Sequence, residues 1–245
     1  MIAIILSAGT GSRLMPLTKH APKTLLKINN ISLLERMIKN CISANISEFI
    51  VVSGYFKDKV INASLEIEKK YDVNITNIEN KEYDKTNTSV STYLASTYIE
   101  NNDLSEDFIL INGDNVIDNE IMKKISESDK TSLVVDNYKQ LNEESFKLKI
   151  EKNYITEIGK WIPINQASGE FIGISKVKSR DLGNFNKILK ELINEDPQNY
   201  YDFTYKQLSK EIEIEFVLTN GLRWTEIDDF SDWEYANELI NSLEK

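Results

Sequence analysis

The chain has 245 residues, 41% of them hydrophobic and 28% charged, which is the composition of a globular protein large enough for one α/β domain. A formal net charge of −10 argues against a basic nucleic-acid-binding face, and no apolar run is long enough to cross a bilayer. A single cysteine and a single histidine exclude an intramolecular disulfide and a histidine- or cysteine-rich metal site, so carboxylates must hold any divalent ion, which favours Mg²⁺. We therefore expect a cytoplasmic protein with no nucleic-acid or membrane partner.

Apolar runs typical of buried strands alternate with helical periodicity in the first half of the chain. The pattern predicts strands at residues 2–6, 49–52, 73–78 and 108–111, and helices at residues 33–44, 57–71 and 88–99. Such an alternation is typical of an α/β protein with a mainly parallel, Rossmann-like central sheet. Crossover rules place the residues that follow the first and fourth strands at one sheet edge, where open α/β sheets bind ligands.

The second half contains shorter strands separated by turns. We predict strands at residues 132–135, 146–150, 155–158, 171–175 and 214–218, helices at residues 184–193 and 203–210, and a last helix from residue 233 capped by Asp232. This pattern indicates an antiparallel C-terminal extension on the same sheet. No linker or repeat interrupts the chain, so we expect one domain over residues 1–245, with a nucleotide-binding half at 1–120 and an acceptor-binding half at 121–245.

A glycine-rich loop follows the first predicted strand directly. Gly9 and Gly11 allow the backbone to approach a phosphate closely, although a tight turn without a ligand has the same composition. Leu14 stands where a dinucleotide-binding loop needs a third glycine, and the Gly-Lys-Ser/Thr of a Walker loop is absent, which disfavours a dinucleotide-dependent oxidoreductase. Arg13 and Lys23 instead supply two cations that can face the same phosphates.

The run L-S-A-G-T-G-S-R-L-M-P-L-T-x3-P-K at residues 6–23 resembles the signature of the nucleoside-triphosphate transferase family, which includes sugar-1-phosphate nucleotidyltransferases and phosphocholine cytidylyltransferases. The resemblance implies a GT-A-like nucleotidyltransferase fold, and members of the family often form homodimers. It implies that Ala8 and Gly9 contact base and ribose through their backbone, that Arg13 binds the β and γ phosphates, and that Lys23 reaches the reacting phosphates. The implied nucleotide-binding loop comprises Leu6, Ala8, Gly9, Thr10, Gly11, Ser12 and Arg13.

Two acidic segments provide candidate metal ligands. Nucleotidyl transfer needs charge neutralisation, and Mg²⁺ held by a pair of carboxylates is the usual means. Asp114, in Asn112-Gly113-Asp114, resembles the metal-binding aspartate of the family, although an Asx turn is the alternative interpretation. The segment E-I-D-D-F-S-D-W resembles the family's closing motif, whose first aspartate, Asp228 here, is the second metal ligand. Asp229 is the alternative for that ligand.

The polar segment at residues 83–94 resembles the corresponding region of cytidylyltransferases that act on phosphocholine, where Asn and Ser precede Tyr-Leu. Amide and hydroxyl groups suit a pyrimidine edge. We therefore expect Asn87 and Ser91, together with Asn112, to contact a nucleotide that is CTP. Helix capping by Asn87 and Thr88 is an equally good interpretation of the same residues.

The acceptor site is predicted around one lysine and one aromatic segment. Lys160 resembles the lysine with which sugar-nucleotide enzymes grip the acceptor phosphate, although a surface-turn lysine is the alternative. Residues 200–205 lie where phosphocholine enzymes place aromatic and acidic residues around the amine, although a helix start with core aromatics has the same pattern. The predicted acceptor-binding residues are Lys160, Trp161, Glu170, Tyr201, Asp202 and Tyr205.

These features predict a magnesium-dependent cytidylyltransferase with Lys23, Arg13 and Lys160 as catalytic cations. We expect it to transfer CMP from CTP to an amine-bearing acceptor (phosphocholine, phosphoethanolamine, 2-aminoethylphosphonate or an amino-acid-derived phosphate) and to release pyrophosphate. A sugar-1-phosphate nucleotidyltransferase using UTP, dTTP or GTP is the runner-up, although the usual Gln-Gly and Gly-Thr-Ala signatures are missing. A non-catalytic nucleotide-sensing domain is the alternative from another class.

Overall fold

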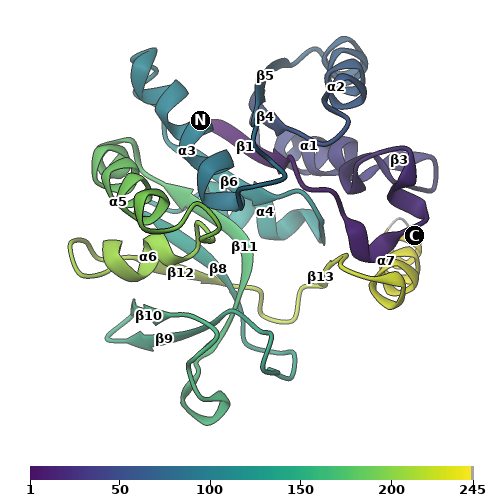
Figure 1. Cartoon of the computed structure of the whole chain (residues 1–245). Coiled ribbons are helices and arrows are strands. Elements are labelled where there is room, and N and C mark those ends of the chain that lie inside the picture. The colour runs from purple at the N-terminus through teal and green to yellow at the C-terminus, as the bar shows by residue number, and fades with distance from the viewer. Residues whose placement is uncertain (244–245) are drawn as a thin grey trace.

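A computed structural model describes residues 1–243 and confirms the predicted α/β architecture (Figure 1). Nine strands form one sheet in the order β10-β9-β11-β6-β1-β4-β5, and β8 pairs with both β11 and β12. The strands of this sheet are β1 (Ile2–Ser7), β4 (Glu48–Ser53), β5 (Asn74–Glu79), β6 (Phe108–Asn112), β8 (Ser132–Asp136), β9 (Lys147–Glu151), β10 (Tyr154–Ile158), β11 (Gly169–Val177) and β12 (Glu215–Leu218).

The sheet is parallel in its first half and mixed in its second. β6, β1, β4 and β5 pair in parallel, whereas β11 runs antiparallel to β6, β8 and β9, and β9 antiparallel to β10. The predicted parallel sheet and antiparallel extension are therefore both confirmed. Two small ribbons lie outside it, formed by β2 (Lys27–Ile28) with β3 (Ile31–Ser32), and by β7 (Asn115–Ile117) with β13 (Trp224–Glu226).

Helices cover both faces of the sheet and enclose two apolar clusters. One cluster includes residues of α1 (Leu33–Ser43), α2 (Lys57–Tyr71), α4 (Asn119–Ser126) and α7 (Phe230–Leu243). The other includes residues of α3 (Thr88–Asn101), α5 (Leu182–Glu195) and α6 (Phe203–Leu208). Because each of these helices buries one apolar side against the sheet, the strands of the centre are apolar on both faces, as parallel strands usually are.

Element boundaries shift by a few residues from the prediction, and the short strands β2, β3 and β7 were not predicted. Helix α4 was also not predicted. It is short and begins after Asp118, whose side chain accepts a hydrogen bond from the backbone N–H of Glu120 at 3.0 Å. The last helix begins at Phe230, not at residue 233. In the part of the chain that the structure describes, no helix has both the length and the apolar character to cross a membrane.

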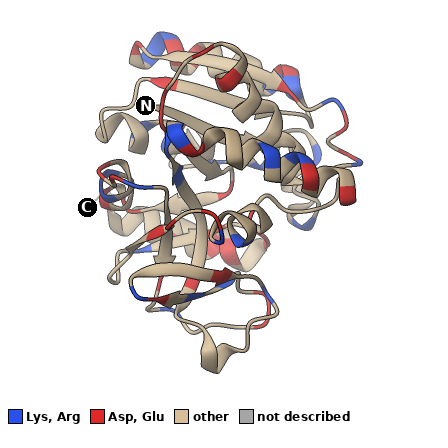
Figure 2. Cartoon of the chain, turned by 90° about the vertical axis from the view of Figure 1, so that its left-hand side faces the viewer, with Lys and Arg blue, Asp and Glu red and all other residues tan. Residues whose placement is uncertain are grey.

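The parallel register fixes which loops meet at one edge. Ser7, Ser53 and Glu79 lie side by side at the carboxyl ends of β1, β4 and β5. Asn112 closes β6 next to Leu6. The residues that follow these strands therefore share the edge at which open α/β sheets bind ligands. The ribbon in Figure 2 shows that basic and acidic residues are interspersed along the chain.

Candidate active site

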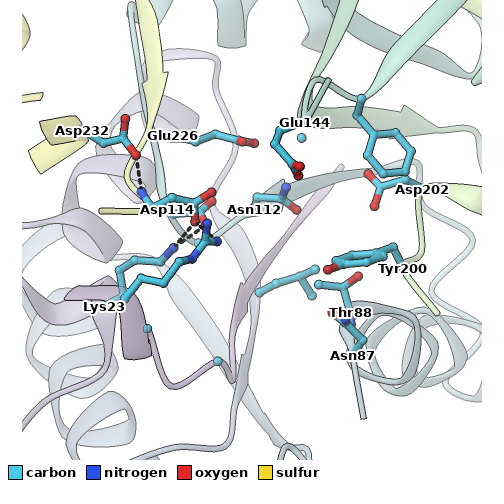
Figure 3. A pocket seen from close by; sticks show the side chains of 18 of the residues that line it. Lys23, Asn87, Thr88, Asn112, Asp114, Glu144, Tyr200, Asp202, Glu226 and Asp232 are labelled. Carbon is cyan, nitrogen blue, oxygen red and sulfur yellow. Dashed lines mark hydrogen bonds and ion pairs between the residues drawn. The ribbon is translucent and has the colours of Figure 1, made fainter. Parts of the chain in front are cut away.

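A cavity of about 870 Å³ opens at this edge, lined by the loop after β1 on one side and by β11, β13 and the loop between β8 and β9 on the other. It brings most of the predicted site residues together (Figure 3). The predicted residues on its wall are Leu6, Ala8, Gly9, Thr10, Gly11, Ser12, Arg13, Lys23, Asn87, Ser91, Asn112, Asp114, Lys160, Glu170, Asp202 and Asp228. Trp161, Tyr201 and Tyr205 do not line the cavity.

The backbone after β1 has a conformation that depends on glycine. Gly11 has φ 61°, and a Cβ atom there would lie 3.0 Å from the Thr18 methyl group and 3.1 Å from Cβ of Lys23. Thr18 also donates a hydrogen bond to the Gly11 carbonyl at 2.9 Å. Gly9, in contrast, has no atom within 4 Å of a Cβ position, so its backbone borders open space in the cavity. The loop is held rigidly at Gly11 and left accessible at Gly9.

The end of β6 is placed by a close backbone approach. A Cβ atom on Gly113 would lie 2.0 Å from the carbonyl oxygen of Leu6, so only glycine lets the chain leave β6 directly against β1. This turn directs Asp114 towards the loop after β1. Its Oδ2 atom accepts a hydrogen bond from Lys23 Nζ at 2.7 Å.

Two carboxylates and two cations, distant in sequence, meet at this point. Lys23 Nζ lies 2.7 Å from Asp114 Oδ2 and 3.2 Å from Asp228 Oδ1, and the Arg13 guanidinium lies 2.9 Å from Asp228 Oδ1. Burial opposes the charge on Lys23, but the two carboxylates outweigh it and raise the pKa of its ammonium group. Lys23 is therefore a fixed cation at the working pH, next to the loop that can bind phosphates.

The structure separates the roles of the two consecutive aspartates. Asp229 Oδ1 accepts hydrogen bonds from the backbone N–H groups of Ser231 and Asp232 at 2.8 and 3.1 Å, while Asp232 Oδ2 accepts from the backbone of Asp228 and Asp229 at 2.8 and 3.1 Å. This reciprocal pattern is a capping box at the start of α7. The cap is thus Asp229, not Asp232 as predicted. Asp228 turns to Lys23 instead.

Lys160 reaches the same cavity from the turn after β10. Its ammonium group pairs with Glu144 Oε2 at 2.8 Å, on the loop between β8 and β9. Both side chains are well exposed, so this pair contributes little to stability and can exchange for another anion. Lys147, which is fully buried, donates to the backbone carbonyls of Asn142, Glu143 and Ser145 at 3.1 to 3.3 Å and holds the loop that carries Glu144.

Trp161 was predicted to bind the acceptor, but it does not line the cavity. Its ring packs 5.8 Å from that of Phe203, the Lys206 ammonium lies 4.2 Å above it, and its Nε1 donates to Glu157 at 2.9 Å. These contacts hold the ring against Phe203 and Lys206, and it is 48% exposed.

Tyr201 and Tyr205 are also displaced from the predicted cage, because both are fully buried in the core. The Tyr201 hydroxyl donates to Asn112 Oδ1 at 3.1 Å, and the Tyr205 hydroxyl pairs with Ser175. Tyr201 therefore supports the cavity wall through Asn112 without facing the cavity. The aromatic residues on the cavity wall include Tyr200, which lies near Asp202 in Figure 3, and Phe146, whose ring centroid is 6.5 Å from that of Tyr200.

Carboxylates gather on the acceptor side of the cavity. Asp202 is only 6% exposed, and its carboxylate receives no hydrogen bond from another described residue, so burial raises its pKa to about 7. Burial, followed by repulsion from Asp114 and Asp228, raises the pKa of Glu226 well above its usual value. Burial also raises the pKa of Glu170. This wall suits a cationic group, which would pair with the carboxylate of Asp202.

Several cavity residues were missing from the sequence prediction. They are Asn80 after β5, and Lys139, Gln140, Asn142, Glu144 and Phe146 in the β8–β9 loop. Tyr83, Thr86, Tyr200 and Glu226 lie within segments that the sequence singled out, but they were not among the predicted site residues. The position after β5 offered one signal, since the carboxyl end of a parallel strand is where ligands bind. The long polar stretch after the predicted strand 132–135 was a second signal.

The chain belongs to the nucleotidyl transferase family, because the family's sequence model matches residues 2–146. It is therefore a nucleotidyltransferase, which agrees with a cavity that joins a glycine loop, two cations and two carboxylates.

Two curated relatives match over nearly the whole chain. The CTP:phosphoglutamine cytidylyltransferase of Campylobacter jejuni is 31% identical over 97% of this chain and 100% of its own length. The choline-phosphate cytidylyltransferase of Haemophilus influenzae is 27% identical over 98% of this chain and 97% of its own length. Among solved structures, the CTP:phosphocholine cytidylyltransferase of Streptococcus pneumoniae superposes with a TM-score of 0.79 at 22% identity, covering 98% of this chain and 99% of that one, which supports the fold.

Proposed function

We propose that this nucleotidyltransferase transfers CMP from CTP to a small phosphate or phosphonate acceptor that carries an amine. The observation that carries the proposal is the division of the cavity into two chemical halves. Lys23 and Arg13 lie beside the glycine loop, and across the cavity the carboxylate of Asp202, which accepts no hydrogen bond from another described residue, lies near the Tyr200 ring (Figure 3). A phosphate thus meets cations, and an ammonium group meets a carboxylate and an aromatic face.

The proposed reaction needs no protein nucleophile. An oxygen of the acceptor phosphate, already ionised at neutral pH, attacks the α-phosphorus of CTP in line, and the bond from that phosphorus to the bridging β-oxygen breaks. The electron pair leaves with pyrophosphate. Arg13 and Lys23 stabilise the negative charge on the triphosphate, and Lys160 exchanges Glu144 for the acceptor phosphate. Catalysis then rests on alignment and charge, as is usual for this chemistry.

The aspartate pair fits the proposed Mg²⁺. Among residues 1–243, no three acidic, histidine or cysteine side chains lie close enough to form a metal site by themselves. However, Asp114 Oδ1 is buried without a hydrogen-bond partner in the described chain. The carboxylates of Asp114 and Asp228 also lie close together, because both pair with the Lys23 ammonium group. Oxygen ligands from two carboxylates and a triphosphate match the preference of Mg²⁺. When bound, Mg²⁺ would supply charge neutralisation to the triphosphate.

The relatives support the choice of nucleotide and acceptor class. The Campylobacter jejuni protein is named for CTP and phosphoglutamine, and the Haemophilus influenzae protein for choline phosphate. Phosphoglutamine and phosphocholine share a phosphate, a small carbon skeleton and nitrogen. The test is pyrophosphate release from each of CTP, UTP, GTP and dTTP with phosphocholine, phosphoglutamine, 2-aminoethylphosphonate and glucose 1-phosphate. We expect turnover with CTP and an amine-bearing acceptor, and turnover with glucose 1-phosphate alone would reject the proposal.

Asp202→Asn is expected to weaken binding of the acceptor and to leave binding of CTP unchanged, because it removes the buried charge that faces the ammonium group of the acceptor. The KM for an amine-bearing acceptor should rise by about 10- to 100-fold, whereas the KM for CTP should stay near its wild-type value. With a carbon isostere such as 3,3-dimethylbutyl phosphate in place of phosphocholine, wild type and variant should differ little. Equal losses with both acceptors would show that Asp202 does not read the positive charge.

The same variant should change how stability depends on pH. The pKa of Asp202 is about 7 in the folded protein against 3.8 when unperturbed, so between these values the folded state holds a proton that the unfolded state has released. The free energy of unfolding therefore falls as the pH rises through this window, by up to about 4 kcal/mol. Denaturant titrations of Asp202→Asn at pH 4 and pH 8 should show a smaller fall than those of the wild type.

A further inference from the structure

A polar cluster at the carboxyl end of β5 has its hydrogen-bond directions fixed by the backbone. Asn80 is 2% exposed, and its Oδ1 accepts the backbone N–H of Glu82 at 3.1 Å. Because a backbone N–H can only donate, this bond fixes the orientation of the amide. The Nδ2 atom of Asn80 must then donate, and it donates to Thr86 Oγ1 at 3.0 Å and to Ser91 Oγ at 3.1 Å.

The hydroxyl group of Thr86 is fully determined by these contacts. It accepts from Asn80 and donates its single hydrogen to the carbonyl oxygen of Glu82 at 2.8 Å. A hydroxyl has one hydrogen and two lone pairs, so Thr86 can offer only its second lone pair to a ligand. The side chain is half-buried and lines the cavity. Thr86 is therefore an acceptor, and only an acceptor, towards whatever binds beside it.

The hydroxyl group of Ser91 has the opposite character. It accepts from Asn80 at 3.1 Å, and its own hydrogen has no acceptor among the residues that the structure describes. Ser91 is 4% exposed and lines the cavity, so this hydrogen is available to a ligand. An acceptor at Thr86 and a donor at Ser91 thus stand side by side on the wall, both held by one amide.

We infer that Asn80, Thr86 and Ser91 form a reader for the cytosine edge, in which Asn80 is a positioning residue that sets the direction of both hydrogen bonds. Cytosine presents an amino donor at N4 and an acceptor at N3, which match Thr86 and Ser91. Uracil presents an acceptor at O4, which meets the lone pair of Thr86, and a donor at N3, which meets the hydrogen of Ser91. The cluster therefore favours CTP and disfavours UTP.

The position of the cluster agrees with this role. Ser7 and Glu79 end β1 and β5 in register, so the glycine loop that follows Ser7 and the cluster that begins at Asn80 lie at the same sheet edge. Both line the one cavity of about 870 Å³. A nucleotide whose phosphates lie at the loop can therefore reach the cluster with its base. The inference rests on the proposed use of CTP and adds the residues that select it.

Thr86→Val tests the inference, because it keeps the shape of the side chain and removes the lone pair. The measured quantity is the ratio of kcat/KM for CTP to that for UTP, from pyrophosphate release with phosphocholine as acceptor. We expect the ratio to fall by about tenfold, the worth of one hydrogen bond. Thr86→Ser, which restores the hydroxyl, should restore the preference for CTP. Thr97→Val is the matched control, because Thr97 lies on α3 with Ser91, its hydroxyl donates to the Tyr93 carbonyl, and it does not line the cavity.

Asn80→Asp tests the positioning role independently. The new carboxylate can only accept, so Ser91 must donate its hydrogen to it and present lone pairs to the base, which suits the N3–H of uracil. The CTP preference should then fall, with UTP gaining relative to CTP. Thermal unfolding of each variant separates these effects from loss of fold. If Asn80→Asp does not fold, the comparison of Thr86→Val with Thr86→Ser tests the inference by itself.

The outcomes separate the inference from the proposed function. A wild-type protein that prefers another triphosphate to CTP overturns the proposed nucleotide and the reader with it. A wild-type protein that prefers CTP, together with Thr86→Val and Asn80→Asp variants that keep the wild-type ratio, overturns the reader alone.

Discussion

Asp114→Asn and Asp228→Asn are each expected to lower the rate of nucleotidyl transfer on the order of 1,000-fold. Each change removes one of the two carboxylates that would hold Mg²⁺, and it leaves the shape of the side chain intact. The Lys23 ammonium keeps its other carboxylate, at 2.7 or 3.2 Å, so the fold should survive. The measurements are pyrophosphate release at saturating CTP and Mg²⁺, and thermal unfolding as a check of folding.

Asp229→Asn is the matched control, one residue away. Asp229 caps α7 and makes no contact with Lys23, so the variant should keep its activity. Its stability should change by no more than about 1 kcal/mol, because asparagine also caps helices well. Full activity in Asp228→Asn, or an equal loss in Asp229→Asn, would contradict the assignment of Asp228.

Lys23→Met is expected to lower kcat/KM by about 100- to 1,000-fold and to destabilise the protein. The ammonium group lies within 3.2 Å of both carboxylates and is 16% exposed, so its removal leaves Asp114 without its cation and Asp228 with only the exposed Arg13 guanidinium. The destabilisation should be about 2 kcal/mol, less than for a fully buried pair, since Asp228 is partly exposed. Denaturant titration measures the stability, and pyrophosphate release measures the activity.

The pH dependence distinguishes this explanation from simple loss of packing. The raised pKa of Lys23 keeps the ammonium charged from pH 5 to pH 8, so the wild-type ion pairs persist over this range. In the variant, the two negative charges repel each other without the ammonium between them, and this repulsion weakens as the solution becomes more acidic. The destabilisation should therefore be larger at pH 8 than at pH 5. Lys19→Met, in the same loop but outside the cavity, should change neither quantity. A destabilisation of the same size at both pH values would contradict the electrostatic explanation.

The sequence predicted the site best where charged residues of a recognisable motif follow the end of a strand. Lys23, Asp114 and Asp228 lie 91 to 205 residues apart along the chain and meet within 3.2 Å, as the motif resemblance implied. Parallel strands make such predictions tractable, because their carboxyl ends share one edge. The choice between Asp228 and Asp229 needed the structure, since only the capping box shows which of the two turns away.

The acceptor wall could not be derived from composition. Tyr201 and Tyr205 lie four residues apart around the start of α6, so they share one helix side, and that side packs against Phe171 in the core. The residue pattern of 200–205 contained the right carboxylate, Asp202, but did not show that Tyr200 would be the ring on the cavity side. The burial of the helix decided which aromatic side chains point inward.

The hydrogen-bond directions at Asn80 could not be predicted from the sequence. They depend on the backbone N–H of Glu82 and on the meeting of Thr86 with a residue of α3, neither of which a pattern of residue types specifies. By contrast, α4 had a readable signal, because Asp118 precedes it as an N-cap.

The central claim is that a cytidylyl group passes from CTP to an amine-bearing phosphate, and isotopic labelling tests it most directly. With CTP labelled at the α-phosphorus and either phosphocholine or phosphoglutamine as acceptor, the label should appear in a product that contains both the cytidine and the acceptor. With CTP labelled at the γ-phosphorus, the label should appear only in pyrophosphate. Recovery of the α label as free CMP, or of the γ label on the acceptor, would contradict the proposed transfer.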